Sequence, residues 1–248
     1  MEILKKIDAI ISENIVLKEL KFSHLSYMKD YNIGIFYRET KNKFDIISYG
    51  FGYDHRDFDP ITISKESLRS WTSFKTIENI LSAIFASSDS DNHFNNAYEF
   101  ILYRKETLTN KMGPVISSDK ITKELLYKNG KLYPEKVEEA INNINISIKE
   151  HHLPFFNEFV CIKDLNDKII EKYDWLDWSN FLFKDSYLKA IIIMKLSDND
   201  KQYKSFTTMY KARIYNSIQE GNTELINSYE RFIKVMEFLD SGKHLSST

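Results

Sequence analysis

The chain has 248 residues, of which 42% are hydrophobic and 28% are charged, so it is long enough to bury a substantial core. Its formal net charge is −2, whereas domains that hold nucleic acid through bulk electrostatics are usually clearly basic. The composition therefore favours a folded, well-solvated protein and argues against a nucleic-acid partner held in that way.

The most apolar run, residues 190–194, is flanked by Lys189 and Lys195. It is far shorter than the ~20 apolar residues that span a bilayer. The first six residues have the pattern of an amphipathic helix and lack the long apolar core of a secretory signal. We therefore expect a cytoplasmic protein with no membrane partner.

The N-terminal part mixes helical spacing with short β-branched and aromatic runs, which predicts an α+β region over residues 1–110. The predicted elements, in chain order, are a helix over 2–12, hairpin strands over 33–38 and 44–53, a short strand over 60–64, a helix over 76–86 and a possible strand over 97–104.

Two glycines lie on one face of the second hairpin strand. Because side chains alternate along a strand, Gly50 and Gly52 share a face with Ser48, and Tyr49 and Phe51 lie on the other. Two missing side chains predict that a helix or a neighbouring backbone approaches the sheet closely at this face.

Residues 111–134 show no clear apolar periodicity and contain three turn-forming pairs with Gly or Pro. This pattern predicts a connecting segment. Residues 135–248 then show only helical spacing. The first helix covers 135–150, and the last two are predicted to form an antiparallel hairpin around Gly221. The apolar stripe expected on the final helix consists of Leu225, Tyr229, Phe232, Ile233 and Met236. The fold class predicted is α+β, an N-terminal antiparallel sheet with helices followed by a C-terminal helical bundle.

The first of these helices runs into His152-Leu153-Pro154-Phe155-Phe156-x-x-Phe159. Pro154 disfavours helical geometry at Leu153, so we expect the helix to end there and the phenylalanines to anchor a turn. Residues 135–170 resemble the helix junction of an uncharacterised bacterial domain-of-unknown-function family. Some members of that family are suspected to be immunity-type partners of toxins. The resemblance implies a protein-binding role and carries over no catalytic residue.

A dense group of acid–base residues occupies positions 54–59. On an extended segment His55, Asp57 and Asp59 would project to the same side and could bind a divalent metal. The other interpretation is a solvated loop, since charged, turn-forming residues are expected between two strands and before Pro60. This group is the basis of one functional hypothesis, a metal-assisted hydrolase.

A second dense group interleaves aromatic and acidic side chains, as surfaces that recognise a basic partner do. It consists of Tyr173, Asp174, Trp175, Asp177 and Trp178. Alternatively, the aromatic side chains fill the space between two helices while the carboxylates face water.

Phosphate-binding glycine loops, nucleophile elbows and paired cysteines are absent from the sequence, so we expect no cofactor. The favoured hypothesis is a non-enzymatic protein-binding module, of an immunity type, whose partner is another protein. The sequence makes no prediction about oligomeric state.

Overall fold

The computed structural model describes residues 2–28, 33–53, 59–63, 68–85, 105–110 and 124–243. The chain forms two compact units, each built from two segments. Unit 1 comprises Met1–Thr72 and Thr109–Glu158, and unit 2 comprises Ser73–Leu108 and Phe159–Thr248. The division predicted at residues 110 and 134 groups the chain differently, because the helix that begins at Pro134 belongs to unit 1 and the helix that begins at Lys75 belongs to unit 2.

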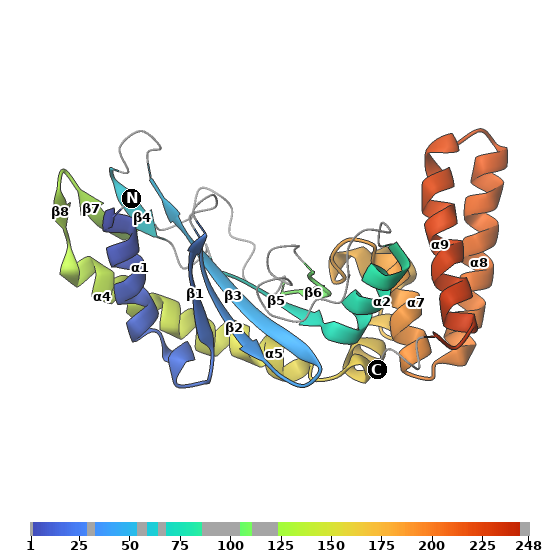
Figure 1. The fold of residues 1–248 in the computed structure, drawn as a ribbon, viewed down its shortest axis with the longest axis horizontal. Coiled ribbons are helices and arrows are strands. Elements are labelled where there is room, and N and C mark those ends of the chain that lie inside the picture. The colour runs from blue at the N-terminus through green and yellow to red at the C-terminus, as the bar shows by residue number, and fades with distance from the viewer. Residues whose placement is uncertain are drawn as a thin grey trace. The chain divides into compact units, whose positions relative to one another are not determined.

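Unit 1 contains the sheet and a long helix (Figure 1). Its elements are α1 (Glu2–Asn14), the 3-10 turn η1 (Val16–Lys18), β1 (Ser23–Met28), β2 (Ile33–Glu39), β3 (Lys43–Gly52), β4 (Ile61–Ile63), β5 (Arg69–Phe74, which ends in unit 2), β6 (Leu108–Thr109, which begins there), β7 (Glu124–Lys128), β8 (Lys131–Leu132), α4 (Pro134–Ser147), the π-helical turn η4 (Ile148–His152) and α5 (Leu153–Glu158).

The described strands form a sheet in the order β1-β2-β3-β4-β7-β8, and β5 pairs with β3 and β6. The neighbours along this path are antiparallel, so the predicted fold class is confirmed. The predicted hairpin is also confirmed, with Gly34 opposite Tyr49 and Arg38 opposite Asp45. The strand expected over 97–104 lies outside the described residues.

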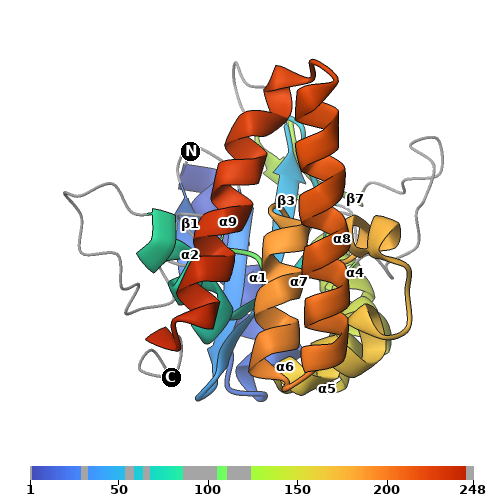
Figure 2. The ribbon, with the colours of Figure 1, turned by 90° about the vertical axis from the view of Figure 1, so that its right-hand side faces the viewer.

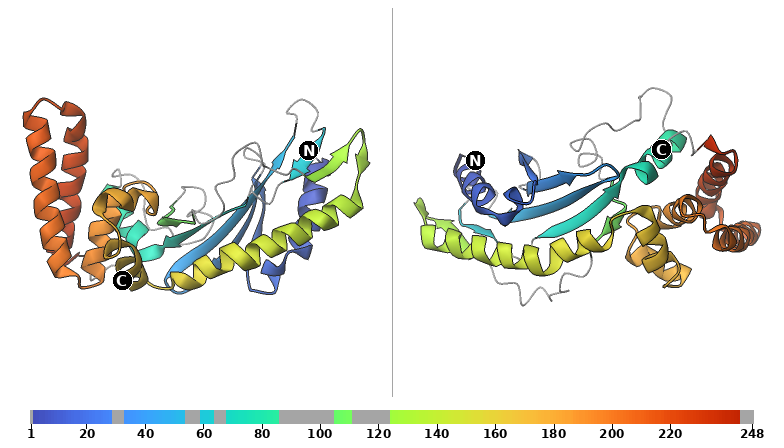
Figure 3. Two further views of the ribbon diagram at one scale, coloured as in Figure 1. Left: turned by 180° about the vertical axis from the view of Figure 1, so that it is seen from behind. Right: turned by 90° about the horizontal axis from the view of Figure 1, so that it is seen from below.

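The sequence predicted that the helix beginning at Pro134 ends at Leu153, but in the structure it does not end there. It continues through η4 into α5, and Leu153 has helical dihedrals of φ −65° and ψ −43°. In the π turn the Leu153 N–H bonds to the carbonyl of Ile148, one residue further back than in an α-helix. This widened turn lets the helix pass Pro154, whose ring would otherwise meet the carbonyl four residues earlier. Figure 3 shows the resulting continuous helix, from Pro134 to Glu158, running along the sheet of unit 1.

This helix packs its apolar side against the rest of unit 1, and the helix predicted over residues 135–150 is confirmed. Its buried residues are Val137, Ala140, Ile141, Ile144, Ile148, Phe155 and Phe156.

The close approach predicted at Gly50 and Gly52 occurs instead at Gly34 of β2. A Cβ atom at Gly50 would meet no other atom within 4 Å, whereas one at Gly52 would lie 2.7 Å from the Thr62 hydroxyl, a side chain of β4 and not a helix or a backbone. At Gly34 it would lie 2.1 Å from Cζ of Tyr49, the residue directly opposite on β3. The missing side chain therefore admits a cross-strand aromatic ring and not a helix.

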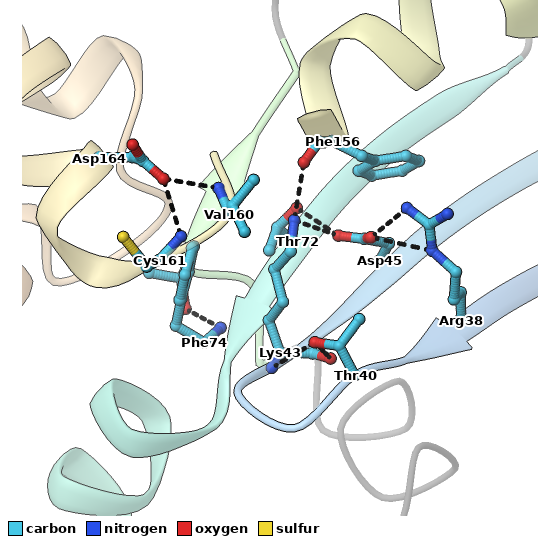
Figure 4. A network of polar contacts seen from close by, with 11 residues as sticks. Arg38, Thr40, Lys43, Asp45, Thr72, Phe74, Phe156, Val160, Cys161 and Asp164 are labelled. Atoms are coloured by element: carbon cyan, nitrogen blue, oxygen red, sulfur yellow. Dashed lines mark hydrogen bonds and ion pairs between the residues drawn. The ribbon is translucent and has the colours of Figure 1, made fainter. Parts of the chain in front are cut away.

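A buried carboxylate organises the turn end of the hairpin in unit 1 (Figure 4). Asp45 is 0% exposed and accepts hydrogen bonds from Arg38 Nη2 at 2.8 Å and Thr72 Oγ1 at 3.3 Å. The ammonium of Lys43 lies 2.8 Å from Asp45 and donates to the carbonyl of Phe156 at 2.9 Å. This network ties β3 to β2, β5 and α5.

Unit 2 is almost entirely helical. Its elements are α2 (Lys75–Phe85), α6 (Ile162–Leu165), the π-helical turn η5 (Asn166–Ile170), the 3-10 helix η6 (Trp175–Asn180), α7 (Ser186–Leu196), α8 (Asp200–Gln219), the 3-10 turn η7 (Thr223–Leu225) and α9 (Ile226–Asp240). Figure 2 shows α8 and α9 side by side, the predicted antiparallel hairpin. Gly221, with φ of +101°, provides the left-handed residue at its loop.

The centre of unit 2 is α7, whose residues from Leu188 to Met194 are all buried. One of them is charged: Lys189 Nζ lies 2.8 Å from Glu78 Oε1 on α2, and both side chains are 4% exposed. Thr107 Oγ1 also donates to Glu78 Oε1, at 2.7 Å. A buried ion pair therefore joins α2, α7 and the segment before β6.

The N-terminus of α6 in unit 2 is capped by Asp164. Its carboxylate accepts the backbone N–H groups of Val160 at 2.8 Å and Cys161 at 2.9 Å (Figure 4). Partial burial alone would raise the pKa of Asp164, but these hydrogen bonds, together with the Cys161 side chain and the charge of Lys168, outweigh it and lower the pKa below its usual value.

Candidate protein-interaction surface

The aromatic–acidic segment of the sequence forms the exposed 3-10 helix η6 in unit 2. Asp174 precedes it with extended dihedrals, φ −62° and ψ 150°, and its side chain accepts the backbone N–H of Leu176 at 3.0 Å. This Asx-type cap explains why an aspartate begins the turn.

Trp175 lies half-buried against α7 and α8 of unit 2. Its ring centroid is 5.7 Å from that of Tyr187 on α7 and 6.1 Å from that of Tyr210 on α8. The guanidinium carbon of Arg213 lies 5.0 Å from the ring centroid, a cation–π contact. The indole is therefore held in place by neighbouring helices while part of it stays accessible.

Trp178 is an interior residue, at 1% exposure, so it offers no surface to a partner in this conformation. Its Nε1 donates to the carbonyl of Tyr173 at 3.2 Å, and its ring centroid lies 4.9 Å from that of Phe206. The sequence interpretation placed both tryptophans at a contact. A 3-10 helix has three residues per turn, so Trp175 and Trp178 share the side that faces α8.

The same geometry turns Leu176 and Asp177 outward. Leu176 is 58% exposed, and Asp174 and Asp177 on either side of it are also exposed. The sequence analysis did not single out Leu176. A three-residue period applied to residues 175–178 would have separated the inner tryptophans from the outer leucine. We name residues Asp174, Leu176 and Asp177 the η6 ridge.

The remaining aromatic residues beside the ridge are packing partners. The rings of Tyr173 and Phe181 lie 4.5 Å apart. Burial, and to a smaller extent Tyr187, raises the pKa of Tyr210 to about 12, although Arg213 opposes the shift. Tyr210 therefore stays a neutral phenol at physiological pH and is not suited to proton transfer there.

Two of the three residues proposed as a metal site, His55 and Asp57, lie outside the described residues. The third, Asp59, accepts the backbone N–H of Asn129 at 2.6 Å. Within the parts of the chain that the structure describes, no three histidine, cysteine or acidic side chains converge as a metal would require. The metal-assisted hydrolase stays a sequence prediction.

Sequence reasoning missed a buried serine–histidine pair in unit 1. Ser70 Oγ lies 2.7 Å from His152 Nδ1, and Asn110 donates to Ser70 Oγ at 3.1 Å. Ser147 Oγ lies 3.5 Å from the other ring nitrogen of His152. Burial, and then the neighbouring His151, lowers the pKa of His152 to about 4, so its imidazole is neutral at physiological pH.

A neutral imidazole beside a hydroxyl is also the arrangement of a nucleophile and its base. A substrate, however, must reach the hydroxyl, and Ser70 and His152 are only 1% and 5% exposed. We therefore assign this pair a structural role, in which β5 and the π turn η4 satisfy each other's buried polar atoms.

A second buried polar contact in unit 1 involves Tyr49, whose hydroxyl donates to Asp8 on α1. Burial, together with the Asp8 carboxylate, raises the pKa of Tyr49 well above its usual range. His24 Nε2 lies 3.5 Å from the second oxygen of Asp8. The contact fixes the ring of Tyr49 over Gly34 and so joins α1 to the hairpin.

Comparisons of this chain with protein-family models, with curated proteins and with solved structures found no match. Across the described parts of the chain, none of the helices combines the length and the apolar character needed to cross a bilayer.

Proposed function

We propose that this protein is a non-enzymatic binding module that contacts another protein through the η6 ridge. The observation that carries the proposal is Leu176, a large aliphatic side chain that is 58% exposed between two exposed carboxylates. An aliphatic anchor with a charged rim is the usual anatomy of a protein interface.

The ridge is held rigidly, which favours binding. Asp174 caps the turn, Trp178 fixes it from inside, and Trp175 is packed between α7 and α8. Because little side-chain or backbone freedom is lost when such a turn docks, more of the contact energy contributes to affinity.

The charges of the ridge indicate the chemistry of the partner. Asp174 and Asp177 suit an apolar pocket bordered by Lys or Arg, and carboxylates at a rim mainly accelerate and orient association. Residues 135–170 resemble a family with suspected immunity-type members. On this basis we propose that the partner is a toxin and that the two proteins bind in the cytoplasm.

The test is affinity capture from the native host with the full chain as bait, followed by a binding titration with the captured protein. Leu176→Ala is expected to weaken binding by at least about tenfold. Val160→Ala is the matched control, because Val160 is an aliphatic side chain of the same 58% exposure in unit 2. Equal binding by wild type and Leu176→Ala would contradict the proposal. So would a hydrolytic activity that His55→Ala plus Asp57→Ala abolishes.

The acidic rim is tested separately with Asp174→Asn plus Asp177→Asn. The asparagine at 174 keeps the oxygen that caps η6, so the turn is preserved. We expect a lower association rate and a weaker dependence on salt, with little change in the dissociation rate.

A further inference from the structure

Among the residues of unit 2 that the structure describes, the α8–α9 hairpin leaves one apolar face partly exposed. On α9 the residues Ile226, Tyr229, Ile233 and Met236 follow one another at spacings of three and four, so they lie on one side of the helix. Tyr215 of α8 joins them, with its ring centroid 6.3 Å from that of Tyr229. We name these five residues the hairpin face.

The exposure of this face is unusual for side chains of this kind. Tyr215 is 51% exposed and Ile226 is 41% exposed, and the other three are half-buried. An apolar stripe such as the one predicted on the last helix is expected to be buried. In unit 2 only its inner residue Phe232, at 0% exposure, meets that expectation fully.

Other sides of the hairpin are covered. Phe232 packs on Tyr210 with ring centroids 4.9 Å apart, on the side where α7 lies. Arg231 stacks on Phe85 of α2 at 4.5 Å and pairs with Asp185 before α7. In Figure 1 the loop end of the hairpin extends past α7. Within the described residues of unit 2, these contacts leave the hairpin face uncovered, with Tyr215 and Ile226 as its most exposed members.

The two edges of the hairpin face carry opposite charges. On α8, Lys211 and Tyr215 follow Lys204 by seven and eleven residues. These three exposed side chains therefore lie on one side of the helix. On α9 the exposed Glu230 and Glu237 each follow a residue of the face by four positions, Ile226 and Ile233. One edge therefore carries two lysines and the other two glutamates, of which Glu237 has Lys234 and Lys243 beside it.

From this we propose that the hairpin face binds a second copy of the same chain, so that two hairpins form an antiparallel four-helix bundle. A two-fold axis parallel to the helices places α8 of one copy against α9 of the other. The basic edge of each copy then meets the acidic edge of the other, and the five apolar residues meet in the middle.

The available area is sufficient. α8 has 20 residues and is about 30 Å long, and a helix pair is about 20 Å wide. The face thus measures about 600 Å² on each copy, or about 1,200 Å² in total, which reaches the lower limit of stable interfaces. The proposal does not depend on the η6 ridge, which lies beside a different flank of α8, that of Arg213.

The experiment is sedimentation velocity on the full chain from micromolar to submillimolar concentration. The wild type is expected to reach twice the chain mass of 29.4 kDa. Tyr215→Glu plus Ile226→Glu places charges in the middle of the interface and should weaken dimerisation by at least about 100-fold. Asn216→Glu is the matched control for helix and charge, because Asn216 is exposed and points about 100° away from Tyr215 around α8. This control should dimerise like the wild type.

Zero-length carbodiimide crosslinking makes the proposal independent of those variants. In a mixture of isotopically light and heavy wild-type chains, mixed-isotope crosslinks are expected between Lys211 and Glu230 or Glu237. A wild type that stays monomeric throughout the concentration range would overturn the proposal. So would a dimer that the Asn216→Glu control and the double variant form equally well, or mixed crosslinks confined to other surfaces.

Discussion

Both units bury a carboxylate beside a lysine, but they collect the partners of that carboxylate in different ways. In unit 1, Asp45 meets Arg38 and Lys43, which belong to the same hairpin. In unit 2, Glu78 on α2 meets Lys189 on α7, far along the sequence. The two ion pairs of Asp45 can form once the hairpin has closed, whereas the pair of Glu78 and Lys189 waits until distant helices have packed, since loop closure opposes distant contacts.

The charge balance differs as well. Asp45 compensates two cations, one of which, Arg38, keeps 26% of its side chain exposed. Glu78 lies 2.8 Å from Lys189, accepts a hydroxyl hydrogen bond from Thr107 and also attracts the partly buried Lys105. Losing the carboxylate should therefore be more damaging in unit 1, where Arg38 and Lys43 both lie 2.8 Å from it.

The largest effect that we predict is that of Asp45→Asn. The amide keeps the shape of the side chain but leaves Lys43 and Arg38 uncompensated, so unfolding free energy should fall by about 3–5 kcal/mol. Urea unfolding followed by circular dichroism measures it. A loss below about 1 kcal/mol would show that water screens the network and that the contrast with Glu78 is unfounded.

The pH dependence tests a distant contact within unit 1, that of Ser70 with His152. The folded protein lowers the pKa of His152 from 6.5 to about 4, so folding favours its neutral form. The corresponding stability is fully present above pH 6.5 and is lost as the pH falls toward 4, by up to about 3 kcal/mol. Unfolding free energies measured across this range should show the loss in the wild type and not in His152→Gln. Parallel pH profiles for the two proteins would refute the assignment.

A double-mutant cycle with Glu78→Gln and Lys189→Met isolates the long-range pair of unit 2. Because both side chains are 4% exposed, we expect a coupling energy of about 2 kcal/mol. The control cycle uses Arg231 and Asp185, whose side chains are 34% and 33% exposed and whose coupling should stay within about 0.2–1 kcal/mol. Equal coupling in the two cycles would mean that burial does not strengthen the pair.

The smallest predicted effect concerns a contact within the hairpin. Gly34→Ala forces the ring of Tyr49 to move, since the new Cβ would lie 2.1 Å from it, and should destabilise by about 1–3 kcal/mol. Gly50→Ala on the neighbouring strand meets no atom within 4 Å and should change the melting temperature little. Similar melting temperatures for both variants would disprove the close approach at Gly34.

The sequence was informative where structure depends on near neighbours. Alternation and turn residues predicted the β2–β3 hairpin, and a period of 3.6 predicted the helices that begin at Pro134 and Ile226. It was misleading at Pro154, because a π turn removes the clash on which the predicted helix end rested. It was also misleading at Gly50 and Gly52, because the residue opposite each glycine depends on strand register.

The candidate site was predictable in composition but not in orientation. The sequence identified the aromatic–acidic segment, yet which tryptophan is buried depends on the three-residue period of η6 and on the position of Phe206. The contacts of His152 with Ser70 and of Glu78 with Lys189 join segments that no local pattern relates. Such pairs arise from tertiary packing, which a single sequence does not record.

The alternation of segments between the units has a consequence during synthesis. Residues 73–108 of unit 2 leave the ribosome before any residue of 159–248, so α2 emerges without the α7 helix that carries Lys189. Unit 1 acquires its last helix, which ends at Glu158, while α2 and the apolar side chains of Ile77, Ile80 and Leu81 still await their partners. When Glu158 has left the ribosome and α7 has not yet emerged, the nascent chain therefore displays a complete unit 1 together with the unprotected apolar side of α2, the kind of surface that chaperones recognise.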